Sequence, residues 1–432
     1  MTLTSRGIRC RVYESLPSPV VEHGALMLAP NALRILDSLK LYTALQQVGF
    51  NFDTVEFRDE HDDLLDEWQM GGSERYSYQA LRVSRQAFLA VLRDAVVSRG
   101  IQVCYGKMFS HVVSETATGV VLALTDGEQV AVSILIGAGG IYSPARRYVA
   151  PGIEAVYSGM LALIATVDCP PSQPLAENAE TMQHQPQTTF YHNNGAAGDN
   201  SGNAILVMPQ CHDGSQLCLG KQVRYPEQTK EDWLRLSCDS DRLYELFMQD
   251  TTDASWPARV RTSLDMVSKH RIHIWPFYTV PDLPSWTSLP HRRTVLIGDA
   301  AHSMPPTAGQ GACQAIEDAY TLALVIATAS RFALSPDSYS TSIATWEAAR
   351  RERVKRARTF TKRLDNNKLP EDERLKLPEG TYWRNGDIGK EDLTWLYGSG
   401  LANVRARMAP SRIAVELGDG IRGTRIRSAT VA

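Results

Sequence analysis

The sequence predicts an α/β fold in which a helix-covered parallel sheet is joined to a mainly antiparallel β region. Three observations carry this prediction. An apolar strand at 294–297 (TVLI) is followed by glycines, prolines and a long helical stretch, which is the order expected in a parallel α/β sheet. A second apolar strand runs into GAGG at 137–140. Between about 151 and 286, prolines and β-prone residues are frequent, which favours antiparallel strands.

The first elements follow from local signals. Residues 8–14 (IRCRVYE) predict a short strand that ends in an acidic residue. Residues 83–99 predict an amphipathic helix, with Ser84 as its N-cap and Gly100 as its stop. The Asp-Gly pair at 126–127 predicts a hairpin turn.

The remaining elements are mostly helical. A helical patch is expected near 232–249, and two long helices at about 309–330 and 336–364. The basic run at 350–358 (RRERVKRAR) suggests an anionic partner or, more simply, a solvated helix face. Residues 421–432 predict a loose tail.

Composition excludes several classes of protein. The 432 residues are 43% hydrophobic and 22% charged, which is ordinary for a soluble globular protein. The net charge of -3 shows no excess of basic residues of the kind that favours binding to nucleic acid. No run approaches the roughly 20 apolar residues of a membrane span. The seven cysteines are scattered without metal-binding spacing, so reduced thiols, no metal site and a cytoplasmic location are expected.

The strongest motif is GDAAHSMPPTAGQGACQAIEDA at 298–319. Asp299 follows a buried strand, at the edge of the sheet where α/β proteins bind ligands. Gly309 and Gly311 let the backbone approach a ligand closely. The helix that begins there presents unpaired N–H groups and partial positive charge. Together these features predict a site for an electron-rich ring that becomes anionic on reduction.

This motif, with VSRQAFL at 83–89 and IYSPARR at 141–147, resembles the FAD-dependent aromatic hydroxylases. These are the group A flavoprotein monooxygenases of the salicylate and para-hydroxybenzoate hydroxylase type, and the fungal secondary-metabolite members look most similar. The resemblance covers most of residues 7–365. It implies FAD as cofactor, NAD(P)H as reductant, and hydroxylation with O₂ of an aromatic or polyketide/alkaloid-like small molecule in secondary-metabolite biosynthesis.

The resemblance also implies which residues bind FAD. Asp299 would bond the ribityl chain, and the backbone of 309–312 would lie near the flavin pyrimidine. Glu14 would bind the adenosine ribose, while Gly24 and Arg85 would lie along the cofactor and the flavin. The implied cofactor-binding residues are Glu14, Gly24, Arg85, Asp299, Gly309, Gly311 and Ala312.

Two departures from the family pattern stand out. The family opens with a strand and a GxGxxG turn, whereas residues 2–7 match only the end of the helix that follows this turn. Loss of that central strand is expected to expose the edges of its two neighbours and to remove the phosphate nest. Gly139 stands where the second motif normally has an aspartate. A misassigned or truncated start, a degenerate homologue, and weak binding of FAD through the flavin half alone all remain open.

No motif selects a catalytic base. His302 and Met304 are expected to be packing residues more often than catalytic ones. The aromatic run at 274–278 (IWPFY) either walls the substrate pocket or belongs to the core. Further candidates in the middle of the chain, each more simply structural, are Tyr191, His192, Arg224 and Tyr225.

The resemblance implies a discontinuous, Rossmann-like FAD-binding domain, incomplete at its N-terminus, and a separate substrate domain. A non-catalytic homologue and a flavin oxidase or dehydrogenase are the alternative functions. The sequence predicts no oligomeric state. The expected boundaries are 1–50, 76–156 and 286–365 for FAD binding, 51–75 and 157–285 for the substrate, and 366–432 for a C-terminal extension.

Overall fold

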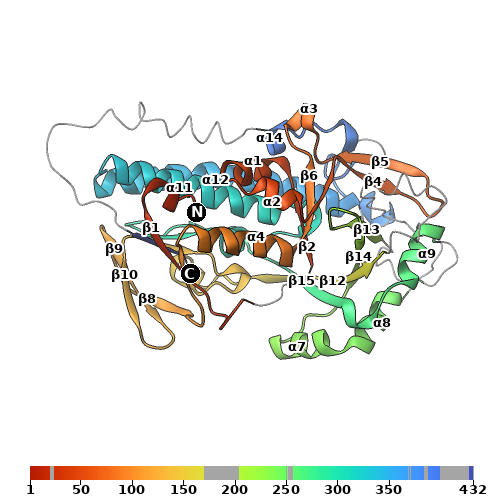
Figure 1. Ribbon diagram of the computed structural model, residues 1–432, viewed down its shortest axis with the longest axis horizontal. Coiled ribbons are helices and arrows are strands. Elements are labelled where there is room, and N and C mark those ends of the chain that lie inside the picture. Colours follow the sequence, from red (N-terminus) through yellow and green to blue (C-terminus); the bar gives the residue numbers. More distant parts are fainter. Residues whose placement is uncertain are drawn as a thin grey trace.

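The computed structural model places two main sheets beside a pair of long helices (Figure 1). One sheet is parallel and has five strands, and the other is antiparallel and has four. This arrangement confirms the predicted α/β fold. The structure describes residues 1–19, 24–169, 204–249, 251, 256–367, 369, 371–383, 388–398 and 428–431.

The parallel sheet has the strand order β16-β11-β17-β1-β7. One buried cluster packs its strands against the two long helices and against the β8–β10 sheet, so this sheet lies at the centre of the main core. The carboxyl ends of all five strands meet at one edge, because every pair in the sheet is parallel. The strands are β1 (Arg9–Tyr13), β7 (Gln102–Cys104), β11 (Leu135–Gly137), β16 (Thr294–Leu296) and β17 (Ser428–Val431).

The central position of this sheet is filled from the other end of the chain. β17 pairs in parallel with β1 on one side, where Cys10 lies opposite Ala429, and with β11 on the other, where Ile136 lies opposite Val431. Two expectations are therefore wrong: the strands on either side do not expose their edges there, and residues 428–431 are not a loose tail. The pairing satisfies backbone N–H and C=O groups that an empty position would leave without partners.

The antiparallel sheet has the order β13-β14-β12-β15. Alternate side chains of its strands pack against helices α7, α8 and α9, which cover one face. The opposite face packs against a small sheet of β2 (Ala25–Leu28), β6 (Ala80–Ser84) and β3 (Phe50–Phe52), because Leu206 and Met208 share a buried cluster with residues of these strands. The bounds are β12 (Val156–Asp168), β13 (Ile205–Pro209), β14 (Gln216–Arg224), β15 (Ile272–Thr279), α7 (Lys230–Cys238), α8 (Ser240–Met248) and α9 (Ala258–Asp265).

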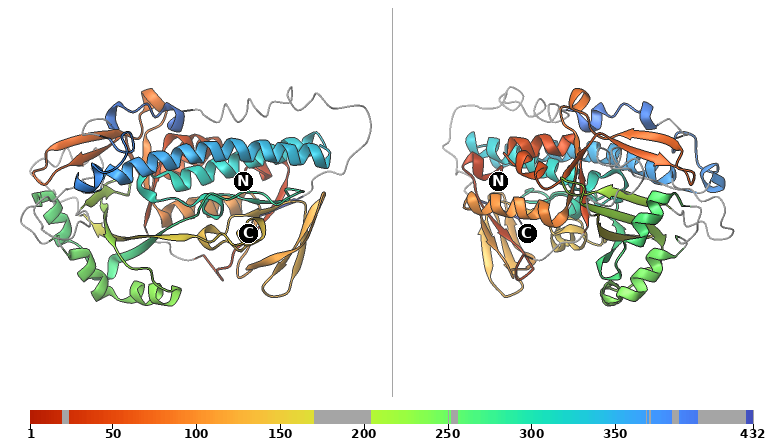
Figure 2. Two further views of the ribbon diagram at one scale, coloured as in Figure 1. Left: turned by 180° about the vertical axis from the view of Figure 1, so that it is seen from behind. Right: turned by 45° about the vertical axis from the view of Figure 1, so that its right-hand side comes forward.

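The two long helices lie side by side along the molecule (Figure 2). They are α11 (Gln310–Arg331) and α12 (Pro336–Asn367), close to the predicted ranges. The description of 350–358 as a solvated face is wrong in part, because Arg350 is entirely buried between the helices. Among the helices of the described residues, none combines the length and apolar character that crossing a bilayer requires.

Other local predictions are confirmed. Helix α4 (Arg85–Ser98) starts after Ser84, whose Oγ accepts a hydrogen bond from Ala87 N at 3.2 Å. The turn at 126–127 joins β9 to β10. The remaining elements are α1 (Pro30–Ser38), α2 (Tyr42–Gln46), α3 (Ser73–Tyr76), α5 (Pro144–Val149), α10 (Asp299–His302), α13 (Glu371–Arg374), α14 (Thr394–Tyr397), β2 (Ala25–Leu28), β3 (Phe50–Phe52), β4 (Thr54–Arg58), β5 (Leu64–Gln69), β6 (Ala80–Ser84), β8 (Phe109–Thr116), β9 (Gly119–Leu124) and β10 (Gln129–Val132).

Candidate cofactor site

Asp299 lies just beyond the carboxyl end of β16, at the start of the short helix α10. Its side chain is exposed to solvent, but enough protein surrounds it that burial raises the pKa of the carboxyl, an effect partly offset by the charges of His302 and Arg85. Within the described residues, no donor bonds this carboxylate. A partly enclosed carboxylate that is accessible and has no partner is suited to accept hydrogen bonds from a ligand.

The start of α11 is equally open to a ligand. Gly309 is the N-cap and has φ +61°, and no side chain caps the helix. A Cβ atom at Gly311 would meet nothing within 4 Å, so the backbone there borders open space. Ala312, half-buried, completes the first turn. The buried side-chain amide nitrogen of Gln310 also has no hydrogen-bond partner among the described residues. These groups fit an electron-rich or anionic ring edge.

Gly24 and Arg85 belong to the same region. Arg85 N donates to the carbonyl of Gly24 at 3.0 Å. The Arg85 guanidinium lies over the ring of Trp275, 4.5 Å from its centroid, which fixes the cation against the antiparallel sheet. A Cβ atom at Gly24 would lie 3.9 Å from both Arg85 Cδ and Ile164 Cδ1. Gly24 and Arg85 therefore lie together where the two sheets meet. The positive charge of Arg85 is close enough to Asp299 to offset part of the rise in the pKa of its carboxyl.

Glu14 lies at the same edge of the parallel sheet, immediately after β1. Its Oε1 accepts hydrogen bonds from Leu16 N at 2.9 Å and from Ser15 Oγ at 3.2 Å. Within the described part of the chain, it makes no hydrogen bond with the other six predicted residues. The structure thus brings Gly24 and Arg85 into contact and Asp299 within reach of the charge of Arg85, and it holds Glu14 by hydrogen bonds from its own turn.

The aromatic run at 274–278 divides between the two roles expected for it. Trp275 is 40% exposed beneath Arg85, whereas Phe277 is buried and Tyr278 accepts a hydrogen bond from Trp233 Nε1 at 3.2 Å. Phe277 thus belongs to the core, and Trp275 is the residue of this run that stays a candidate for the wall of a substrate pocket.

The other candidates lie elsewhere or are structural. Arg224 is exposed and lies 3.5 Å from Glu373, and Tyr225 packs on Trp233. Arg224 and Tyr225 line a surface hollow of about 510 Å³ together with Ser158, Gly159, Met160 and Pro226. Met304 is buried in the main core. Tyr191 and His192 lie outside the described residues.

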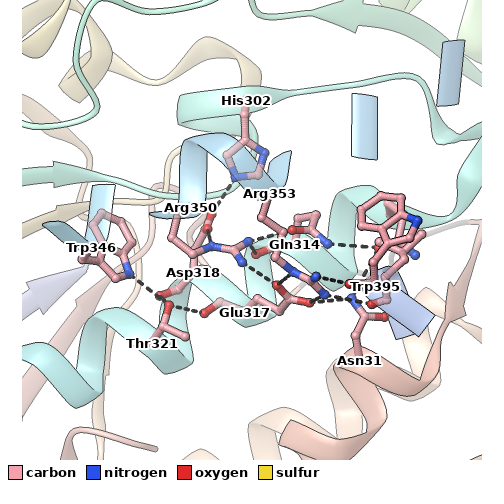
Figure 3. Close-up of polar contacts among 12 residues, drawn as sticks. Asn31, His302, Gln314, Glu317, Asp318, Thr321, Trp346, Arg350, Arg353 and Trp395 are labelled. Atoms are coloured by element: carbon pink, nitrogen blue, oxygen red, sulfur yellow. Dashed lines mark hydrogen bonds and ion pairs between the residues drawn. The ribbon is translucent and has the colours of Figure 1, made fainter. Parts of the chain in front are cut away.

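A buried charge network underlies the start of α11 (Figure 3). His302 Nε2 lies 2.6 Å from Asp318 Oδ2, and the imidazole packs on Trp286 with 4.9 Å between ring centroids. Arg350 Nε donates to Asp318 Oδ1 at 2.7 Å and also pairs with Glu317. Burial alone would raise the pKa of Asp318 and of Glu317, but the facing cations lower the pKa of both carboxyls overall. The network thus supports the helix that carries the glycines.

Sequence reasoning missed Arg146, which is 1% exposed. Its Nη1 donates a hydrogen bond to the carbonyl of Ala300 and its Nε donates one to the carbonyl of Ile153, both at 3.2 Å. The buried Arg146 side chain therefore fixes the position of α10. The available signal was its place in IYSPARR, directly after the second glycine motif.

At Gly139 the backbone has φ −74°, and a Cβ atom would lie 3.4 Å from Ser143 Cα, so the local structure accommodates a side chain.

The fold and the accessible acceptor and donor groups at the junction of the two sheets suit a flavin-binding protein. The sequence profile of the family described as FAD binding domain matches residues 1–361, and the chain belongs to that family. The resemblance to FAD-dependent aromatic hydroxylases and the assignment of FAD as cofactor are thereby confirmed.

Curated relatives match most of the chain. A 3-amino-4-hydroxybenzoate 2-monooxygenase of Streptomyces platensis is 26% identical over 419 residues, which is 94% of this chain and 94% of the relative. The salicylate hydroxylase of Pseudomonas putida is 28% identical over 74% of this chain and 71% of its own. Among solved structures, Klebsiella pneumoniae HpxO complexed with FAD and uric acid has a TM-score of 0.67 at 21% identity, covering 93% of this chain and 92% of that one. This likeness supports the shared fold.

Proposed function

We propose that this protein is a monooxygenase that uses FAD, NAD(P)H and O₂ to hydroxylate a small aromatic molecule, in the biosynthesis of a secondary metabolite. The observation that carries the proposal is the Asp299 carboxylate, which is accessible, lacks a hydrogen-bond partner in the described chain and lies beyond β16 near Arg85. The names of the relatives support an aromatic substrate, because two of them act on hydroxybenzoates.

The residues present fit the riboflavin half of FAD. Asp299 would accept hydrogen bonds from the ribityl hydroxyls, and the open N–H groups of 309–312 would donate to the pyrimidine edge. Gly24 and Arg85 would lie along the cofactor, and Glu14 would bind the adenosine ribose. FAD, when bound, supplies electron transfer from NAD(P)H and transfer of one oxygen atom from O₂ to the substrate.

The chain itself orients the reactants and excludes water. The partial positive charge at the start of α11 would stabilise negative charge on a ring bound there. Arg85 is held by Trp275, so its cation is placed before a ligand arrives. Apolar residues on the inner face of the antiparallel sheet, including Ile164, Leu206 and Met208, would limit access of water to the reacting ring.

The division into an FAD-binding part and a substrate part belongs to this proposal. Its support is that the Asp299 edge lies in the parallel sheet, whereas Trp275 and Ile164 come from the antiparallel one. In this arrangement the substrate would lie between the two sheets, beside the flavin ring.

The test is turnover in ¹⁸O₂ by the full chain purified with FAD. We expect yellow protein, consumption of NAD(P)H that a hydroxylated aromatic acid or phenol stimulates, and one labelled oxygen atom in the product. Turnover without labelled product would favour a flavin oxidase or dehydrogenase. A colourless protein that binds no FAD would favour a non-catalytic homologue, an outcome that Gly139 motivates.

A further inference from the structure

A buried arginine on β6 has no oxygen partner in the described chain. Arg82 is only 7% exposed. Its Nη2 lies 3.3 Å from Sγ of Cys218, and its Nε has no hydrogen-bond partner. A guanidinium has five donors and stays charged at physiological pH. A buried cation with one weak sulfur acceptor is unfavourable, so this position indicates an anion that the described residues do not supply.

The other buried arginines of the described residues satisfy their charge within the chain. Arg146 donates to backbone carbonyls, and Arg350 pairs with two carboxylates. Arg293 lies 3.8 Å from the centroid of the Tyr339 ring and close to the charge of a glutamate. Arg82 differs from all three, because no oxygen or aromatic ring of the described residues partners it.

The Arg82 side chain projects from the face of β6 that is directed at the proposed flavin site. It is the cross-strand partner of Met27 on β2, and directly opposed residues of an antiparallel pair project from the same face. Met27 packs against the start of α11, because a Cβ atom at Gly309 would lie 3.1 Å from Met27 Cβ. The Arg82 side chain is therefore on the same face as the glycines that would receive the flavin.

The partner sulfur places the guanidinium against the inner face of the antiparallel sheet. Cys218 pairs with Thr166 on β12, two positions from Ile164, which borders Gly24. Two strand positions span about 7 Å. The Arg82–Cys218 contact and the Gly24–Ile164 contact therefore lie on one face of the sheet, separated by a distance that an aromatic ring and one substituent can bridge.

We propose that Arg82 binds the carboxylate of the substrate, which is then an aromatic acid. The inference rests on the proposed function, because it places the aromatic ring beside the flavin. The unpaired Nε and the neighbouring amino group form one edge of a planar fork, and a carboxylate matches this edge with two parallel hydrogen bonds. Binding there would supply the missing counter-ion and orient the ring at once.

The test is calorimetric titration of the FAD-loaded full chain with 2-, 3- and 4-hydroxybenzoate and with the corresponding neutral amides. The wild type should bind at least one acid more tightly than its amide. Arg82→Met should weaken binding of that acid about ten- to a hundredfold while affinity for the amide is kept, and Arg82→Lys should fall between. The control Arg224→Met, which removes an exposed arginine from β14, the strand that also carries Cys218, should bind like the wild type. No preference for any acid, or unchanged acid binding by Arg82→Met, would overturn the inference.

Thermal unfolding without ligand separates a binding role from a structural one. Removing an uncompensated buried charge should leave the Tm of Arg82→Met unchanged or raise it, whereas a lower Tm in both Arg82→Met and Arg82→Lys would show a structural arginine and contradict the inference. The titration needs no turnover. Absence of oxygen transfer therefore counts against the proposed function, and loss of acid selectivity counts against the role of Arg82.

Discussion

Replacing Arg350 by methionine should remove the central cation of the network beneath α11. Arg350, Glu317 and Asp318 have no exposed side-chain surface, and Arg350 also donates to the Gln314 side chain at 2.7 Å. Removing one partner of a buried ion pair costs about 3–5 kcal/mol. Glu317 keeps Arg353 and Asp318 keeps His302, so we expect a loss within this range rather than above it.

The pH dependence of this loss gives the sharper test. In the wild type the folded-state pKa of Asp318 is lowered, so its contribution to stability is present at neutral pH and disappears as the pH falls through that low pKa. In Arg350→Met, Asp318 keeps His302 but loses the second cation that lowers its pKa, so this pKa should be higher than in the wild type. Protonation on acidification then relieves the buried charge, so the stability difference from wild type should shrink between about pH 7 and pH 5.

The assay is urea unfolding at several pH values, with Arg351→Met as control on the same helix. Arg351 is partly exposed and lies 3.3 Å from Glu347, so its loss should cost about 1 kcal/mol or less and show little dependence on pH. The reasoning is refuted if Arg350→Met costs less than about 1 kcal/mol at pH 7, or if the cost grows as the pH falls.

Two further predictions concern the glycine turn and the C-terminal strand. Gly309→Ala should cost about 1–2 kcal/mol in urea unfolding, because the backbone has φ +61° and the new Cβ would press on Met27. Gly311→Ala, in open space, should keep stability but weaken FAD binding in a fluorescence titration; equal stability of the two variants would contradict this. Thr430→Pro should cost about 1–3 kcal/mol because β17 is paired on both sides, whereas Thr430→Ala should cost clearly less; equal melting of the two would show that β17 is not central to the sheet.

Local signals in the sequence were enough to predict the elements that carry the residues proposed to bind the flavin half of FAD. Asp299, Gly309 and Gly311 lie within 13 consecutive positions, and the glycines, prolines and apolar run around them indicate strand, turn and helix directly. The cap at Ser84 and the turn at 126–127 were equally local. Such signals depend on a few neighbouring residues, so tertiary packing did not override them.

The features that were missed depend on contacts between distant residues. Nothing in residues 428–431 indicates pairing with β1, more than 400 positions earlier. Arg350 belongs to a basic run typical of a solvated helix face, and its burial follows from the packing of α12 on α11. Arg82 resembles any other strand arginine until Cys218 is placed opposite it. Burial of a charged side chain is a property of the packed fold, which periodicity cannot show.

The central claim is that Asp299 holds the ribityl chain beside the start of α11, and FAD binding by the apoprotein tests it most directly. Loss of a charged hydrogen-bond acceptor should weaken FAD binding about ten- to a hundredfold in Asp299→Ala, while Asp126→Ala, on the β9–β10 turn, should bind FAD like the wild type. Equal affinity of Asp299→Ala and the wild type would contradict the account.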